Sequence, residues 1–275
     1  MKDLIRTSKR WVGMVIVLGL LVCHVAAESG NGTVAQPGAW CSQGQVYGLS
    51  SAQKEMLQTR LQRITGWTQL SFAENGKLEI GDLTAIEGGS LRARLSLLQA
   101  LRSGKQFVIE DHSLSGAVNF GQLDEGTNYT DERIALHLEI YRVRLDFADF
   151  EKISATPEVK DSFDEGFTFL HELLHGLGLK DTHIPNEIGE CETIINEMRA
   201  ELGLPLRAQY LADLLHITPL IKTIRLRFRE QSIDGRGLTR WKTRHLFFTP
   251  DFAFGQESQA FSPNANPTSS CLSLY

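Results

Sequence analysis

The stretch from Phe163 to Leu177 constrains the fold more than any other part of this 275-residue chain. Its apolar side chains recur at the spacing of one helix face, at Phe163, Phe167, Leu170, Leu174 and Leu177. Ser162 and Glu165 match a capping box at its start, and Gly176 and Gly178 follow its last turn. The pattern predicts an amphipathic helix with one side in the core.

Residues 171–175 of this helix read His-Glu-Leu-Leu-His. His171 and His175 are four residues apart, so both imidazoles project from one face and can bind one metal ion. Glu172 lies one step round the helix, where a carboxylate can take a proton from metal-bound water. Zinc suits these ligands and keeps a water in catalytic sites. The alternative interpretation is an amphipathic helix with two core histidines and a surface glutamate.

The longer string His-Glu-Leu-Leu-His-Gly-Leu-Gly-Leu-Lys-Asp, at 171–181, resembles the extended signature HExxHxxGxxH/D of the zincin metallopeptidases. In that signature a glycine, here Gly178, lets the chain turn and return a third ligand three residues later. The resemblance implies His171 and His175 as zinc ligands, Glu172 as general base and Asp181 as third ligand.

Residues 190–210 resemble a different group, the effector-type bacterial metalloproteases. The shared positions after HExxH are Asn196, Arg199, Glu201, Gly203, Pro205 and Arg207. In such proteins a following helix supplies the third ligand, which here implies Glu192 or Glu190. Zincins with Asp or His as third ligand usually carry a Met-containing turn, whereas Met198 falls within a helical pattern. Glu192 is therefore preferred to Asp181 as third ligand.

The N-terminus indicates export. Four basic residues precede an apolar run from Trp11 to Ala27 that ends in small residues, which is typical of a cleaved secretory signal at 1–27. We expect a secreted or periplasmic protein without stable membrane insertion after cleavage. The net charge of −5 becomes −8 once 1–27, with four basic and one acidic residue, is removed. Such an acidic chain is a poor candidate for binding nucleic acid or anionic membrane surfaces.

Three cysteines remain after that cleavage, and an odd number allows at most one internal disulfide. Cys41 and Cys271 lie in loop-like ends of the chain, so a bond between them is one hypothesis. Cys191 lies in an apolar helical stripe, which favours packing over a role as zinc ligand.

The remaining patterns predict an α+β fold of zincin-like type, with a small mixed sheet, the HExxH helix and a C-terminal β-hairpin. The domain spans 51–249, after an extended lead-in at 28–50 and before a loosely ordered tail at 250–275. The expected helices are Gln53–Ile64, Leu91–Leu101, one around Ile188–Leu202, and 206–216. The expected strands are 106–110, 116–120, one within 138–150 at the sheet edge over the cleft, and a hairpin pairing 224–229 with 238–248. Residues 121–133 are acidic and turn-rich, which favours a loop.

These patterns together predict an exported zinc metallopeptidase acting on a peptide or protein substrate. Glu172 activates a zinc-bound water, and Tyr210, His183 or Arg199 helps to stabilise the oxyanion. One alternative is a zinc-binding, non-proteolytic exported protein, that is, a degenerate zincin. Another is an envelope protein whose basic hairpin binds a partner and whose HExxH is fortuitous. The sequence leaves the substrate and the oligomeric state open.

Overall fold

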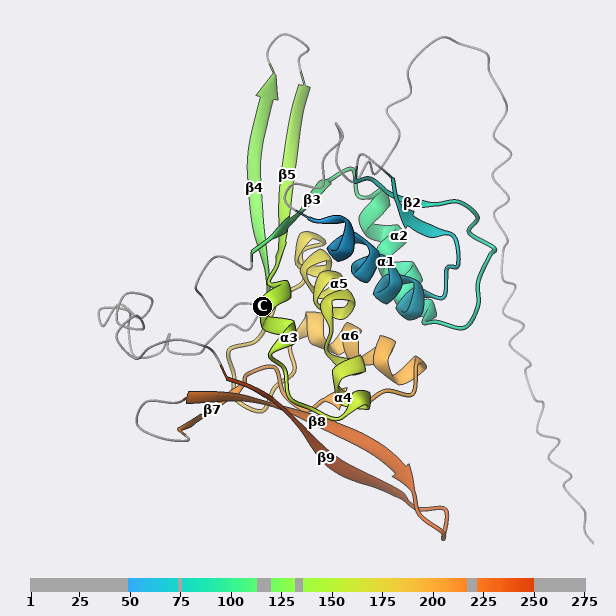
Figure 1. Ribbon diagram of the computed structural model, residues 1–275, viewed down its shortest axis with the longest axis vertical. Coiled ribbons are helices and arrows are strands. Elements are labelled where there is room, and N and C mark those ends of the chain that lie inside the picture. The colour runs from blue at the N-terminus through green and yellow to red at the C-terminus, as the bar shows by residue number, and fades with distance from the viewer. Residues whose placement is uncertain (1–48, 74–75, 113–119, 132–135, 217–221, 250–275) are drawn as a thin grey trace, which may run out of the picture. The chain divides into compact units, whose positions relative to one another are not determined.

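A three-stranded mixed sheet underlies the helix that carries the two histidines. The structure, a computed structural model, describes residues 49–73, 76–112, 120–131, 136–216 and 222–249. The strand order is β3-β5-β4, in which β3 runs parallel and β4 antiparallel to the central strand. Their bounds are Gln106–Asp111 for β3, Gly121–Asp131 for β4 and Leu136–Leu145 for β5. β4 is therefore an edge strand of the described sheet (Figure 1).

Four helices pack with this sheet. They are α1 (Ser51–Thr65), α2 (Leu91–Arg102), α5 (Glu165–Gly176) and α6 (Glu190–Glu201). α5 carries both histidines and contacts the other three helices as well as β4 and β5. Apolar side chains from all of these elements form one continuous core, which fixes the position of α5. A two-stranded ribbon packs beside α1, with strands β1 (Leu70–Phe72) and β2 (Leu78–Ile80).

The C-terminal strands form a second sheet with its own core. Its strands are β6 (Leu206–Arg207), β7 (Asp213–His216), β8 (Lys222–Ile233) and β9 (Thr239–Phe248), and β8 pairs with the other three. Two short helices precede α5, namely α3 (Phe147–Glu151) and α4 (Pro157–Ser162). Six aromatic side chains dominate this second core: Phe120, Phe150, Phe163, Tyr210, Phe228 and Phe248. The sheet thereby supports the segment that leads into α5.

The structure confirms several elements expected from periodicity. The predicted α+β class, the helices near 53–64, 91–101 and 188–202, the strand at 106–110 and the C-terminal hairpin are all present. No helix among the described residues is long and apolar enough to cross a membrane. The predicted signal at 1–27, nearly all of the lead-in at 28–50, the tail at 250–275, and Cys41 and Cys271 lie outside the described residues.

Four predictions of local structure are wrong. Residues 121–131 form strand β4 rather than a loop, because they pair along β5. The strand within 138–150 is therefore central rather than at the sheet edge, and it ends at Leu145 before α3. Residues 206–216 form two short strands against β8 rather than a helix. The α5 N-cap is Asp164, which accepts a hydrogen bond from the Phe167 amide, whereas Ser162 ends α4.

Candidate metal centre

The two histidines of α5 point the same nitrogen at one carboxylate. Nε2 of His171 lies 3.2 Å from Oδ1 of Asp181, and Nε2 of His175 lies 3.0 Å from Oδ2. Tetrahedral zinc with bonds of 2.0–2.1 Å holds neighbouring ligand atoms about 3.3 Å apart. The two observed separations are close to that value, so these three side chains could hold a metal ion.

The other nitrogen of each ring faces an oxygen atom. Nδ1 of His175 lies 3.0 Å from the Leu179 carbonyl oxygen, and Nδ1 of His171 lies 3.5 Å from Oε2 of Glu192. An Nδ1–H directed at such an oxygen leaves Nε2 as the basic, metal-binding nitrogen. The orientation of both rings therefore suits a metal site, with each Nε2 directed at Asp181.

A tight turn after α5 brings Asp181 back to the histidines. Gly178 has a φ of +93°, a backbone conformation that favours glycine, and its amide bonds the His175 carbonyl. Glu190 then fixes the loop, because its carboxylate accepts a hydrogen bond from the Lys180 amide and its own amide bonds the Lys180 carbonyl. Glu190 is exposed and engaged with this backbone, so its observed role is to position the loop that carries Asp181.

Glu192 lies behind His171 rather than beside Asp181. Its side chain is fully buried, with one carboxylate oxygen toward His171 Nδ1 and the other bound by Arg199. Arg199 and nearby charges hold the pKa of Glu192 well below its usual range despite burial. Of the third ligands proposed from sequence, the geometry favours Asp181 over Glu192, since only Asp181 faces both Nε2 atoms.

Cys191 completes a group of four side chains that could hold a metal ion. Ligand atoms of His171, His175, Asp181 and Cys191 all lie within 4.8 Å of one another. The Cys191 sulfur, however, lies 3.5 Å from Nδ1 of His175, on the side of the ring away from Nε2. Burial raises the pKa of this thiol, and nearby carboxylates add to the effect. Packing against the His175 ring accounts for its observed position.

Glu172 lies beside this group and is almost completely buried. One of its oxygens, Oε1, has no hydrogen-bond partner within the described part of the chain. Burial raises the Glu172 pKa to about 7, although both histidines and the Leu123 backbone hydrogen bond oppose the shift. A buried carboxylate oxygen costs free energy unless something binds it. A pKa near 7 would let Glu172 both accept and release a proton near neutral pH.

Burial and nearby charges together shift the pKa values of the candidate metal ligands. Burial opposes a charge on His171, but Asp181 and Glu192 outweigh that effect and raise its pKa to about 9. Burial and the charge of His171 oppose a charge on His175 as well, but Asp181 and Glu172 outweigh them and raise its pKa. Burial alone would raise the pKa of Asp181, yet its two histidine partners lower it. A metal ion that binds here would displace any proton held on the histidine nitrogens that face Asp181.

Of the three residues expected to stabilise an oxyanion, Tyr210 lies beside His171 and Asp181. The Tyr210 hydroxyl donates a 2.5 Å hydrogen bond to Oδ2 of Asp181, and its ring is parallel to that of His171, with centroids 6.1 Å apart. His183 is exposed, and Arg199 is buried against Glu192. Local sequence patterns cannot indicate the Tyr210–Asp181 bond, because the two residues are 29 positions apart.

Asn196 in α6 and Arg207 in β6 position Tyr210. The Asn196 side chain bonds both the amide and the carbonyl of Arg207, and the Arg207 guanidinium donates to the carbonyls of Gln209 and Tyr210. Asn196 also accepts a hydrogen bond from Arg199. Three of the residues singled out after HExxH thus connect the His171 side of the site to the Tyr210 loop.

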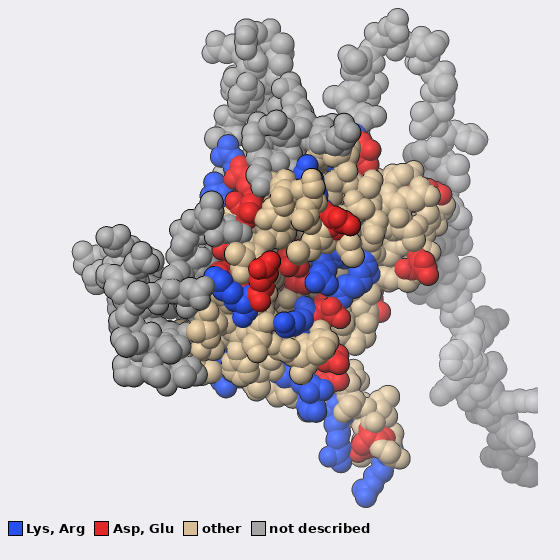
Figure 2. Space-filling model, viewed as in Figure 1, with Lys and Arg blue, Asp and Glu red and all other residues tan. Residues whose placement is uncertain are grey.

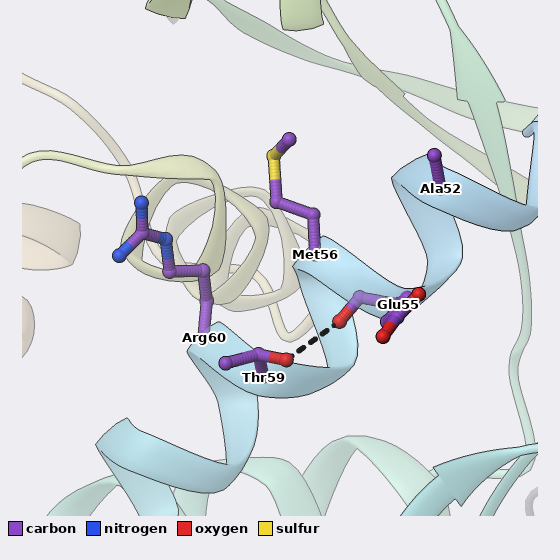
Figure 3. Close-up of a pocket in the computed structure, with 5 residues that line it drawn as sticks. All are labelled: Ala52, Glu55, Met56, Thr59 and Arg60. Atoms are coloured by element: carbon purple, nitrogen blue, oxygen red, sulfur yellow. Dashed lines mark hydrogen bonds between the residues drawn. The ribbon is translucent and has the colours of Figure 1, made fainter.

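A surface hollow of about 420 Å³ lies elsewhere, on α1. Figure 3 shows its lining residues, which all come from this single helix: Ala52, Glu55, Met56, Thr59 and Arg60. The Thr59 hydroxyl donates to the Glu55 carbonyl, and Arg60 pairs with Asp164 and Glu165. These groups serve helix α1 and the start of α5, so the hollow is separate from the histidine group.

No family model matches the chain, and neither a curated protein nor a solved structure matches it.

Proposed function

We propose that this protein is an exported, zincin-like zinc metallopeptidase. Its metal ligands would be Nε2 of His171, Nε2 of His175 and the Asp181 carboxylate, with Glu172 as general base. The observation that carries the proposal is the shared orientation of the two imidazoles, with both Nε2 atoms on one carboxylate and both Nδ1 atoms on other oxygens.

The proposed chemistry is hydrolysis of a peptide bond. Zinc, when bound, supplies a Lewis acid that polarises the scissile carbonyl and makes water a stronger nucleophile. The Glu172 Oε1 atom accepts the proton of that water and later delivers it to the leaving amine. Burial of Glu172 supports this role, because it raises the pKa of the carboxyl group in the metal-free protein to about 7, toward that of a proton acceptor at neutral pH.

An extended substrate would bind along the edge of β4 that no described strand covers. The backbone of Leu123 hydrogen-bonds the Glu172 side chain, so the Leu123 amide points away from β5 and toward α5. In an antiparallel pair the N–H and C=O of one residue point the same way, so the Leu123 carbonyl is directed to the same edge. A peptide pairing with this edge would pass close to Glu172. Export itself rests on the sequence of residues 1–27.

Substitution of Glu172 by glutamine tests the proposal. The amide keeps the size of the side chain but cannot accept the proton, so hydrolysis of denatured casein or a peptide library should fall about 10²–10⁴-fold. The zinc content should stay unchanged, because Glu172 is not a ligand in this arrangement. Equal turnover by wild type and Glu172→Gln would remove Glu172 from the mechanism.

A structural zinc site is the rival that one observation favours. The four-residue group of His171, His175, Asp181 and Cys191 would saturate a tetrahedral ion and leave no position for water. The protein would then be a degenerate zincin, a binding protein that holds zinc without turnover. This rival requires Cys191 for metal binding, whereas the peptidase does not.

A further inference from the structure

The end of the β8–β9 hairpin pairs only with itself. β6 and β7 reach along β8 no farther than Arg229, and beyond that residue β8 pairs with β9 alone. Figure 1 shows the two strands continuing together past the rest of their sheet. Nearly all side chains from 231 to 243 are exposed. The hairpin tip, which we define as residues 231–243, is thus a two-stranded ribbon in solvent.

Three large apolar side chains lie at this tip. Ile233 is 73% exposed, Leu238 is 59% exposed and Trp241 is 54% exposed. Ile233 and Trp241 share one face, because Ile233 pairs with Thr239 and Gln231 pairs with Trp241. Single exposed apolar side chains are ordinary on a protein surface, but a cluster of them marks an interaction site.

The same ribbon is strongly basic within an acidic chain. Residues 231–243 contain three basic residues, Arg236, Arg240 and Lys242, and one acidic residue, Asp234. Arg236 and Lys242 form no ion pair with the described residues, while Arg240 pairs with Asp234. Figure 2 shows these blue side chains along the hairpin at the lower right. The tip therefore has a local positive charge despite the net charge of −5.

Hydrogen bonds hold the turn of the tip in one shape. The Asp234 carboxylate accepts from the amides of Arg236 and Leu238 and from the Arg240 guanidinium. The Asp234 amide also bonds the Leu238 carbonyl. The turn is thus already ordered before any partner binds, which lowers the entropy cost of binding.

We infer that the hairpin tip binds an anionic phospholipid surface. Apolar side chains extend from one face and from the turn, while Lys242 lies on the opposite face, so a partner must surround the ribbon. A deformable bilayer interface can do so, and tryptophan favours that interface. Arg236 and Lys242 would then meet the anionic headgroups. The net charge averages over the whole chain and so conceals this local surface.

Vesicle sedimentation tests the inference. The full chain is mixed with vesicles of phosphatidylcholine, with or without phosphatidylglycerol, so that segment 1–27 is common to all variants. We expect tighter binding to the anionic vesicles. Each cation near such a surface strengthens binding about fivefold, so Arg236→Glu with Lys242→Glu should weaken it at least 25-fold. Ile233→Ser with Trp241→Ser should weaken it about tenfold.

Matched controls lie on α2. Leu95 is 51% exposed and Arg102 is exposed, so Leu95→Ser and Arg102→Glu change similar surface groups away from the hairpin and should bind as wild type. Wild-type binding by both hairpin double variants would overturn the inference. A second outcome would also overturn the inference: only the charge variant loses binding, and polyglutamate displaces the protein from the vesicles. That result would identify an acidic polypeptide as the partner.

Discussion

Glu172 combines burial with two charged neighbours, and burial has the larger effect. Its side chain is 1% exposed, and its pKa rises to about 7 although His171 and His175 favour the charged form. A carboxyl group with a raised folded-state pKa stabilises the protein while it is protonated. That contribution is complete below the usual pKa of 4.5 and is lost as the pH rises through about 7.

The pH dependence of unfolding therefore depends on Glu172. In the metal-free protein, raising the pH from 5 to 8 should lower the free energy of unfolding by up to about 3 kcal/mol through Glu172. The Glu172→Gln variant should not show this decrease. Urea unfolding with a chelator present, at both pH values, measures this difference between the two proteins. Identical changes in both proteins would show that Glu172 ionises at an ordinary pKa.

The spacing of residues 171–175 was sufficient to place His171, Glu172 and His175 at one site. It could not decide between Asp181 and Glu192, because the two carboxylates lie on opposite sides of the same imidazole. That difference arises from the turn at Gly178 and from the buried partner Arg199, neither of which local periodicity encodes.

Helix α6 carries a buried polar network built around Arg199. The Arg199 guanidinium is fully buried, bonded to Glu192, Asn196 and the Ser162 carbonyl, and lies over the rings of Phe167 and Phe228. This arrangement connects α6 to the start of α5 and to β8. Arg199 thereby determines where Glu192 sits behind His171.

Arg199→Met should be strongly destabilising because it leaves the Glu192 charge buried and uncompensated. The expected loss is about 3–5 kcal/mol, and the double variant with Glu192→Gln should recover part of it. Chemical denaturation of both proteins gives the comparison. The exposed Arg92–Glu197 pair is the control, where Arg92→Met should cost less than about 1 kcal/mol. A double variant no more stable than Arg199→Met would contradict the coupling.

Strand β4 approaches α5 closely because Gly121 has no side chain. A Cβ at this position would lie 2.4 Å from Cγ2 of Thr168 and 3.1 Å from Oε1 of Glu172. Gly121→Ala should therefore cost about 1–3 kcal/mol and reduce turnover by displacing Glu172. Thr168→Ser removes the clashing methyl group and should restore most of the lost stability, while the contact with Glu172 remains. Gly235→Ala, in open space, is the control for stability, and full turnover by Gly121→Ala would refute the close approach.

The helices were predictable from the sequence because their apolar faces repeat within the element itself. Strand β4 was not predictable from the sequence, because its acidic, turn-rich residues are held in place by pairing with β5. Residues 206–216 were also misread, because they are anchored by the buried Arg207 guanidinium and by pairing with β8 rather than by a helical face. Elements stabilised by distant partners carry little local signal.

For the whole molecule, the two cores meet at the residues that form the site. The first core holds α5 and α6, and the second holds Tyr210 on the segment before β7. The Asn196 side chain of α6 bonds the Arg207 backbone, and the Arg207 guanidinium bonds the carbonyls of Gln209 and Tyr210, which joins the two cores. The site should therefore assemble only in the fully folded protein, and metal binding should stabilise the whole fold.

Metal stoichiometry of the purified chain, measured by elemental mass spectrometry, tests the central claim most directly. We expect one zinc per chain, lost in His175→Ala and in Asp181→Asn. The zinc should be retained in Glu190→Gln and in Cys191→Ser, because Glu190 holds only the loop and Cys191 faces the back of the His175 ring. Loss of zinc in Cys191→Ser would identify the closed structural site instead. No zinc in the wild type, even after its addition and removal of the excess, would contradict the account.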